Sequence, residues 1–224
     1  MSDKTSQWVL RPGDPGWPAA LDDLGPHAPE SLYVSSSNTD PAAFRAALAK
    51  AVSIVGARAA TAYGEHLASL MAANLAASGF TIISGGAYGI DAAAHRAALN
   101  KGLTVAVMAC GLDQFYPPAN ENLLREIARR GWLVSEHPPG TPPARDRFLT
   151  RNRLIAALGQ AAVVVEAAVC SKSLNTAAHA HRLGRPVGAA PGPVTSAASI
   201  GCHQLIQSGA AKLVTDADDV LAML

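Results

Sequence analysis

The sequence predicts an α/β protein with an extended Rossmann-like fold: a doubly wound, mostly parallel sheet with helices on both faces. From residue 52 onward, short runs rich in Val and Ile alternate with helical stretches, as the right-handed crossovers of a parallel sheet require. Two of these runs are followed by glycine and a helix, at Gly56 and at Gly85, which is typical of phosphate-binding turns at the carboxyl edge of such a sheet. Apolar residues make up 49% of the 224 residues, enough for a large core.

The first 40 residues differ in composition from the rest of the chain. They are rich in Pro, Gly, Asp and Ser, and we expect an irregular lead-in with one short strand at residues 32–34. Residues 41–224 are expected to form the Rossmann-like domain. It begins with a helix over residues 41–50, because Asp40 suits the N-cap and Pro41 suits the first turn.

The alternation that follows predicts six or seven strands in order along the chain. Strands are expected at residues 52–55, 81–83, 104–109, 133–135, 161–166, 187–190 and 212–214. Helices are expected at residues 61–78, 91–100, 120–130, 151–158, 174–183, 200–208 and 216–224, several of them ended by glycine. Residues 138–147 contain prolines and arginines and predict a basic loop.

The charge of the chain is nearly balanced, with a formal net charge of +1. A strong field over the whole molecule is therefore absent, and binding of nucleic acid would need a local basic patch. Arg145, Arg147, Arg151 and Arg153 form such a cluster in the sequence. A solvated loop is the plainer interpretation of the same residues.

Several classes of protein are disfavoured by what the sequence lacks. The three cysteines have no metal-ligand spacing and an odd count, so we expect no disulfide framework, no metal and no cofactor. No apolar stretch reaches 18 residues and the N-terminus has no apolar leader, which predicts a cytoplasmic protein that does not enter a membrane. No catalytic motif is present, and this favours a binding protein over an enzyme.

The two glycine turns supply the first group of candidate phosphate ligands. Glycine lets a phosphate approach the backbone, and arginine donates to its oxygens in a fork. After the second turn, Asp91 is as well placed to be an N-cap as to contact a ligand, and His95 is expected to pack rather than react. The candidates here are Gly56, Arg58, Ser84, Gly85, Gly86, Gly89 and Asp91.

A second group of candidates follows the basic loop. Two arginines that flank an asparagine at a helix start would hold consecutive phosphates, and a carboxylate at the end of an apolar strand is typical of a site. Hydroxyls and a cation before the helix at 174–183 form another anion seat. These candidates are Arg151, Asn152, Arg153, Glu166, Ser171, Lys172 and Ser173. Tyr116 is expected to pack over a helix end.

Seven motifs in this order resemble the DNA-processing protein A family, also called DprA or Smf. They are Val55-Gly56-Ala57-Arg58, Ser84-Gly85-Gly86-Ala87-Tyr88-Gly89-Ile90-Asp91-Ala92-Ala93-Ala94-His95, Gly111-Leu112-Asp113 with Tyr116-Pro117-Pro118, Ser135-Glu136-His137-Pro138-Pro139-Gly140, Phe148-Leu149-Thr150-Arg151-Asn152-Arg153-Leu154-Ile155-Ala156, Val164-Val165-Glu166-Ala167 and Pro191-Gly192. The resemblance covers residues 52–211 closely and extends into the lead-in.

This resemblance implies a protein that binds single-stranded DNA in a basic pocket at the carboxyl edge of the sheet. It further implies a cytoplasmic homodimer that hands the strand to RecA during natural transformation (competence) or recombination. The phosphate-binding candidates carry over at the matching positions. We expect a form made of the Rossmann domain alone, without the winged-helix and helical modules of many relatives.

The chain departs from the family pattern at two places. Tyr88 stands where many relatives carry a basic residue. Where relatives often have Arg-Ser-Gly-Ser, this chain has Cys170-Ser171-Lys172-Ser173. Fewer basic residues would suit a smaller anion, so a nucleotide-sensing domain is the alternative. A phosphoribohydrolase-like enzyme with Glu166 as its acid or base is a third, weaker hypothesis, since the Pro-Gly-Gly-x-Gly-Thr turn of those enzymes is absent.

Overall fold

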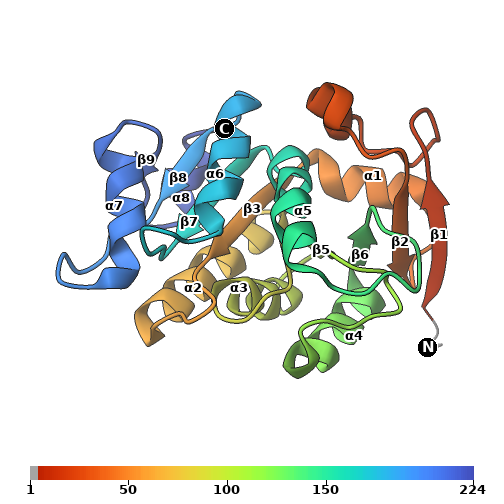
Figure 1. Ribbon diagram of the computed structural model, residues 1–224, viewed down its shortest axis with the longest axis horizontal. Coiled ribbons are helices and arrows are strands. Elements are labelled where there is room, and N and C mark those ends of the chain that lie inside the picture. Colours follow the sequence, from red (N-terminus) through yellow and green to blue (C-terminus); the bar gives the residue numbers. More distant parts are fainter. Residues whose placement is uncertain (1–4) are drawn as a thin grey trace.

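The computed structural model describes residues 5–224 and contains one nine-stranded sheet between two layers of helices (Figure 1). The strands are β1 Ser6–Leu10, β2 Leu32–Ser36, β3 Ala51–Gly56, β4 Thr81–Ser84, β5 Thr104–Val107, β6 Trp132–Ser135, β7 Ala161–Val165, β8 Val187–Ala189 and β9 Lys212–Leu213. The α-helices are α1 Pro41–Ala49, α2 Ala62–Ala77, α3 Ile90–Leu99, α4 Glu121–Arg130, α5 Arg145–Leu158, α6 Ser173–Arg182, α7 Ile200–Gln207 and α8 Ala217–Leu221. Short 3₁₀ helices are η1 Ala19–His27, η2 Pro118–Asn120 and η3 Ala197–Ser199.

The strand order is β1-β2-β6-β5-β4-β3-β7-β8-β9. Strands β3 to β9 are parallel to their neighbours, whereas β2 joins β6 in an antiparallel pair and β1 joins β2 in another. The chain builds outward from β3 in one direction through β4 and β5, and later in the other direction from β7. The order therefore reverses between β3 and β7, and a crevice is expected at the carboxyl ends of these two strands.

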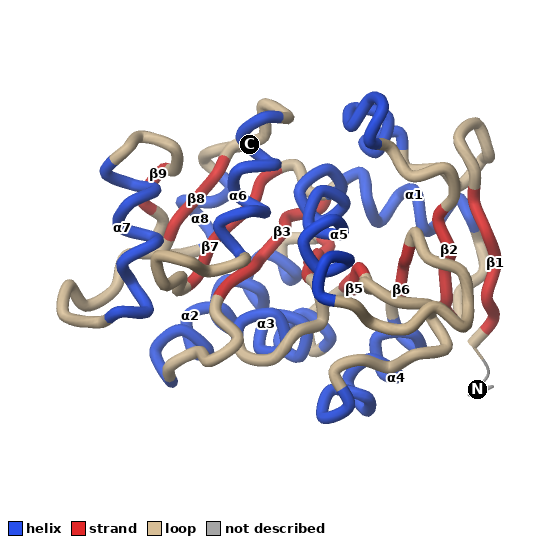
Figure 2. The backbone as a smooth tube through the Cα atoms, viewed as in Figure 1, coloured by secondary structure: helices blue, strands red, loops and turns tan. Residues whose placement is uncertain are grey.

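Both faces of the sheet are covered, which confirms the predicted doubly wound fold. Successive residues of a strand point to opposite faces, and β3 follows this rule: Val55 joins the core under α1, α5 and α6, while Ile54 joins the core under α2 and α3. In the tube view, α5 and α6 lie side by side across β3 and β7 (Figure 2). The same two helices are packed against each other.

Most predicted elements are present within one or two residues of the expected bounds. The Asp40 carboxylate accepts a hydrogen bond from the Ala42 N–H at 2.9 Å, and the Thr61 hydroxyl caps α2. Both confirm the expected helix starts. No helix in residues 5–224 is long and apolar enough to cross a membrane.

The lead-in and the basic loop differ from expectation. Besides the expected strand, residues 5–40 form β1 and η1, and only Leu10 of β1 is buried, so its edge position leaves no alternating pattern in the sequence. The division at residue 40 stays a prediction. Helix α5 begins at Arg145 rather than at residue 151, so two arginines expected in a loop are helical. Its N-cap, Ala144, makes no side-chain cap bond, and the usual start signal is therefore missing.

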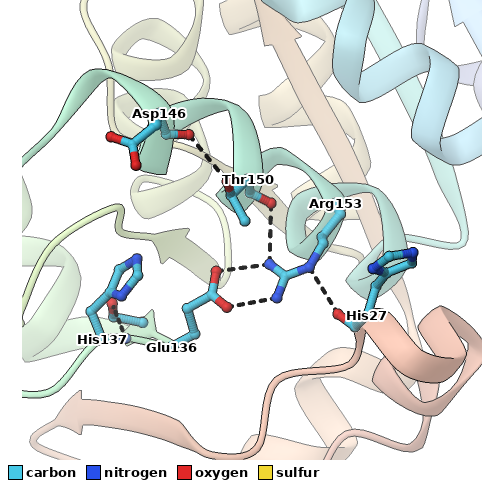
Figure 3. Close-up of polar contacts among 7 residues, drawn as sticks. His27, Glu136, His137, Asp146, Thr150 and Arg153 are labelled. Carbon is cyan, nitrogen blue, oxygen red and sulfur yellow. Dashed lines mark hydrogen bonds and ion pairs between the residues drawn. The ribbon is translucent and has the colours of Figure 1, made fainter.

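The Arg153 side chain ties three segments of the fold together (Figure 3). Its guanidinium reaches from α5 to the Glu136 carboxylate after β6, with N···O distances of 2.7 and 2.6 Å. Its Nε donates to the His27 carbonyl at 2.9 Å. The two charged side chains are only 12% and 13% exposed. This contact fixes η1 and the loop after β6 against α5.

His95 of α3 is fully buried and its ring Nδ1 lies 2.7 Å from the Thr104 Oγ1. Burial, with smaller contributions from Arg151 and Arg96, lowers the pKa of His95 to about 3. The ring is therefore neutral in the folded protein and packs under the sheet, as expected from the sequence.

Removal of Arg153 should destabilise the fold. In Arg153→Ala the partly buried Glu136 carboxylate loses its partner, and we expect a loss of about 3 kcal/mol in the free energy of unfolding. Urea denaturation measures it. The control is Arg125→Ala, which breaks the exposed Arg125–Glu121 pair and should cost below about 1 kcal/mol. Equal losses in both variants would contradict the buried clamp.

The buried His95 should make the protein less stable in acid. Its folded pKa lies below the value of about 6.5 in the unfolded chain, so the unfolded state gains the proton first as pH falls. The stability that the neutral ring contributes is present above pH 6.5 and is lost toward pH 3. Between pH 7.5 and pH 5, wild type should lose about 2 kcal/mol more than His95→Gln. Parallel pH profiles in urea denaturation would disprove this assignment.

Candidate functional site

Two adjoining cavities open at the carboxyl ends of β3 and β7, where the strand order reverses. One has a volume of about 40 Å³ and lies over Arg151 and Asp91, and the other has a volume of about 500 Å³ and extends toward η3. Both are lined by Gly56, Arg58, Lys172 and Ser173. We call the two together the switch-point site.

Three cations gather at this site without carboxylate partners. Within residues 5–224, Arg58, Arg145 and Lys172 form no ion pair. Burial lowers the pKa of Lys172, and the positive charges of Arg58 and Arg145 lower it further. Three positive charges that repel one another and lack a counter-charge favour an anionic ligand.

An aromatic ring lies among these cations. The Arg58 Cζ lies 5.1 Å from the centroid of the Phe148 ring, and the Arg151 Cζ lies 6.0 Å from it. The Tyr116 ring packs against the same ring with centroids 5.6 Å apart. The Phe148 ring therefore packs against two arginines of the site and against a second aromatic ring.

Arg151 is buried at the bottom of the site and is 3% exposed. Its Nη1 donates to the Gly85 carbonyl at 2.9 Å and to the Val107 carbonyl. Burial lowers its pKa to about 10, while the nearby Asp91 carboxylate raises it in part. The guanidinium stays protonated at neutral pH, holds the glycine loop to the end of β5, and contributes positive potential.

The Asp91 carboxylate binds the glycine loop from the other side. Its Oδ2 accepts from the N–H groups of Gly85 at 3.1 Å and Ala87 at 3.3 Å. Burial raises the pKa of Asp91, and Arg151 opposes this shift. Two backbone donors of the loop are thus already used within the protein. Asp91 is also not the N-cap of α3, because Gly89 holds that place.

Three other backbone donors of this loop have no partner within the described chain. Within the part of the chain that the structure describes, the N–H groups of Gly86, Tyr88 and Gly89 have no acceptor. Gly89 has φ of +69° and lies so near β3 that a Cβ would be 2.4 Å from the Ala57 carbonyl oxygen. Only glycine fits at this position, because any side chain would clash with the Ala57 carbonyl. Its absence of a side chain lets the start of α3 lie close to the end of β3.

Three polar side chains shape the start of α6. The Asn152 Nδ2 donates to the Lys172 carbonyl at 3.2 Å and lies 3.4 Å from the Asn175 Oδ1. The Ser171 and Ser173 hydroxyls bond to each other at 2.7 Å. These contacts fix the backbone that carries the Lys172 side chain.

Other candidates have structural partners. The Ser84 hydroxyl is buried and donates to the Ile54 carbonyl at 2.6 Å, joining β4 to β3. A Cβ on Gly56 would lie 1.9 Å from the Val165 carbonyl oxygen, so close strand packing explains this glycine. Both residues shape the edge of the sheet rather than present a donor to a ligand.

Two predicted ligands lie away from the cations. The Glu166 carboxylate accepts from the Thr61 N–H at 2.8 Å and from its hydroxyl at 2.5 Å, so it caps the start of α2. Glu166 has φ of +56°, and this left-handed backbone turns its side chain toward α2. Arg153 pairs with Glu136, as described above, and lines neither cavity.

Arg145 and Phe148 line neither cavity but lie next to residues that do, and we did not select them as ligands from the sequence. They precede Arg151 at spacings of three residues, and a helix places such residues on one face. The spacing of three residues identifies Arg145 and Phe148 as neighbours of Arg151 only if α5 is known to begin at Arg145.

A family model and several similar proteins identify the family of this chain. A family model described as DNA recombination-mediator protein A matches residues 8–224. A putative DNA processing protein DprA of Mycobacterium tuberculosis is 51% identical over 224 residues, which cover 95% of this chain and 56% of that protein. The DprA protein of Streptococcus pneumoniae is 45% identical over 172 residues, covering 76% of this chain and 60% of that protein.

Solved structures of the same family superimpose closely. The X-ray structure of DprA from Streptococcus pneumoniae has a TM-score of 0.88 and 38% identity, covering 96% of this chain and 73% of that one. A structure of DNA processing protein A from Helicobacter pylori, described in terms of its single-stranded DNA binding mode, has a TM-score of 0.85 and 29% identity, covering 99% and 97%.

The match extends over nearly the whole of this chain but not over the whole of its relatives. The chain spans 56% of the mycobacterial relative and 60% of the pneumococcal one. Sequence, family model and structure agree over the described Rossmann-like domain. The chain belongs to the DNA-processing protein A family, known as DprA or Smf.

Proposed function

We propose that this chain binds single-stranded DNA at the switch-point site and acts in DNA uptake or recombination. The observation that carries the proposal is the group of cations at the switch-point site that have no carboxylate partner among the described residues. The Helicobacter pylori relative, which matches over 99% of this chain, is described as binding single-stranded DNA. The family model itself describes a mediator of DNA recombination.

The cations would contact phosphates. Arg58 is exposed at the mouth of both cavities, and Lys172 and Arg145 lie near it. Lysine and arginine that neutralise phosphates release counterions, so the affinity should fall steeply as salt rises. The unpaired N–H groups of Tyr88 and Gly89, which are not buried, would add backbone donors for phosphate oxygens.

The ring would stack on a base. Aromatic stacking favours single strands, because the faces of the bases in a duplex are covered by their neighbours. Phe148 is partly buried and packs against the Tyr116 ring and the Arg58 guanidinium, so a stacked base would take the place of the guanidinium over the ring. Arg151, Asp91 and Asn152 would act as positioning residues beneath it.

We further infer that the chain works as a homodimer in the cytoplasm and presents the bound strand to RecA. Family membership supports this inference. Sedimentation equilibrium would test the dimer, with a monomer at all concentrations contradicting it. A RecA strand-exchange assay with coated DNA would test the presentation, and no acceleration of RecA loading would contradict it.

A nucleotide-sensing role is the second candidate. The volume of the larger cavity, about 500 Å³, lies in the range of small-ligand sites. A thermal shift with nucleotides and none with oligonucleotides would favour this role.

A phosphoribohydrolase-like reaction has less support. Both oxygens of Glu166, its acid–base candidate, accept hydrogen bonds from Thr61. We therefore propose a binding protein rather than an enzyme. Release of base from nucleoside monophosphates would contradict this choice.

Loss of a cation that has no carboxylate partner should weaken DNA binding and reduce its salt dependence. We expect Arg58→Ala and Lys172→Ala to lower the affinity for a labelled poly-dT oligonucleotide severalfold. Each should reduce the slope of log K against log salt by about 0.7, the value for one single-strand phosphate contact. Fluorescence anisotropy at several salt concentrations measures both quantities. The control is Arg125→Ala, because Arg125 is already paired with Glu121 and should not contact DNA. If the Arg58→Ala/Lys172→Ala double variant binds poly-dT as tightly as wild type, the switch-point site is not the DNA site.

Removal of the ring should reduce the preference for single strands. Phe148→Ala should lose about 1–3 kcal/mol of binding to poly-dT, the usual contribution of a stacked base, whereas Phe148→Tyr should keep most of it. Binding to a duplex of equal length should change little in either variant. If both variants bind the single strand equally well, stacking on Phe148 is excluded.

A further inference from the structure

A separate cavity of about 610 Å³ lies between η1, α5 and α6. It shares no lining residue with the switch-point site. Its volume lies in the range of small-molecule sites. We call it the η1–α6 cavity.

Most polar residues that line this cavity are basic. Arg182, His179 and His27 line it, and the guanidinium of Arg153 borders it with its charge balanced by Glu136. The one carboxylate in the lining, Asp23, bonds to Arg185 at 2.6 Å. Among residues 5–224, Arg182 has no carboxylate partner.

Arg182 and His179 are arranged to present donors. The Arg182 Nη2 lies 2.8 Å from the His179 Nδ1, and since arginine only donates, that ring nitrogen accepts. A neutral ring then carries its proton on Nε2. Burial, together with the charges of Arg182, Arg153 and His27, lowers the pKa of His179 and favours this neutral form. Nε2–H and the remaining guanidinium N–H groups are donors for an anion.

The rest of the lining is apolar. Leu24, Pro26 and Leu183 contribute side chains from η1 and from the end of α6. Cations in the last turn of α6 also interact favourably with the helix dipole. That interaction alone does not explain why His27, on a separate segment, and a cavity lie beside them.

We propose that the η1–α6 cavity binds a small phosphate monoester that carries a planar ring, with the phosphate at Arg182 and His179 and the ring against Leu24 and Pro26. This site is independent of the proposed DNA contacts. A ligand there would rest on η1, α5 and α6 together, and would stabilise the segment that Arg153 holds.

Isothermal titration calorimetry on the full chain tests the proposal with adenosine monophosphate, ribose 5-phosphate and adenosine as probes. We expect adenosine monophosphate to bind more tightly than either of the other two. Arg182→Gln and His179→Gln should each weaken it at least tenfold. His181→Ala, at the same helix end but outside the cavity lining, is the matched control and should bind as wild type does. Thermal denaturation shows whether each variant folds.

Poly-dT binding by the same variants separates this proposal from the proposed function. Arg182→Gln should bind the oligonucleotide normally, and Arg58→Ala should bind adenosine monophosphate normally. The proposal is overturned if wild type binds none of the probes, or if Arg182→Gln binds adenosine monophosphate as well as wild type. It is also overturned if Arg58→Ala alone abolishes binding of adenosine monophosphate, since the nucleotide would then bind at the switch-point site. Loss of poly-dT binding in Arg182→Gln would overturn it as well.

Discussion

A buried guanidinium holds the switch-point site together. Arg151 is nearly inaccessible to solvent and donates to carbonyls of the loop after β4 and of the last residue of β5. A buried charge is costly unless it is hydrogen-bonded. Movement of either carbonyl away from the Arg151 guanidinium would therefore destabilise the protein. The Asp91 carboxylate fixes the same loop through its N–H groups. The glycine loop after β4 is therefore held from both sides by buried charged side chains.

The fold could be predicted largely from the sequence, because strand and helix periods alternate strongly from residue 52 onward. Edge strand β1 was missed, since an exposed strand has no buried side to mark it. Arg151 and Arg153 look equivalent in the sequence. In the structure one lies under the glycine loop and the other pairs with Glu136, seventeen positions earlier in the chain. No residue near Arg153 in the sequence indicates that Glu136 is its partner. The partner of Glu166 is equally hidden in the sequence, because Thr61 lies on a distant segment of the chain.

The balance of charge in the chain is compatible with a local anion site. The acidic residues on the surface of α4 pair with arginines of the same helix. Arg58, Arg145 and Lys172 have no such partners in the described chain. A net charge of +1 thus conceals a positive patch at one edge of the sheet, and short-range contacts rather than a long-range field would govern binding there.

The contact between Asp91 and the glycine loop has a consequence for binding thermodynamics. A loop with free N–H groups has to become ordered when an anion arrives, and that lost conformational freedom subtracts from affinity. Here the carboxylate orders the loop while the chain folds, so the entropy is lost at that stage. A strand that reaches Tyr88 and Gly89 would meet donors that are already in place. Less of the free energy of each phosphate contact would then be lost to ordering the loop.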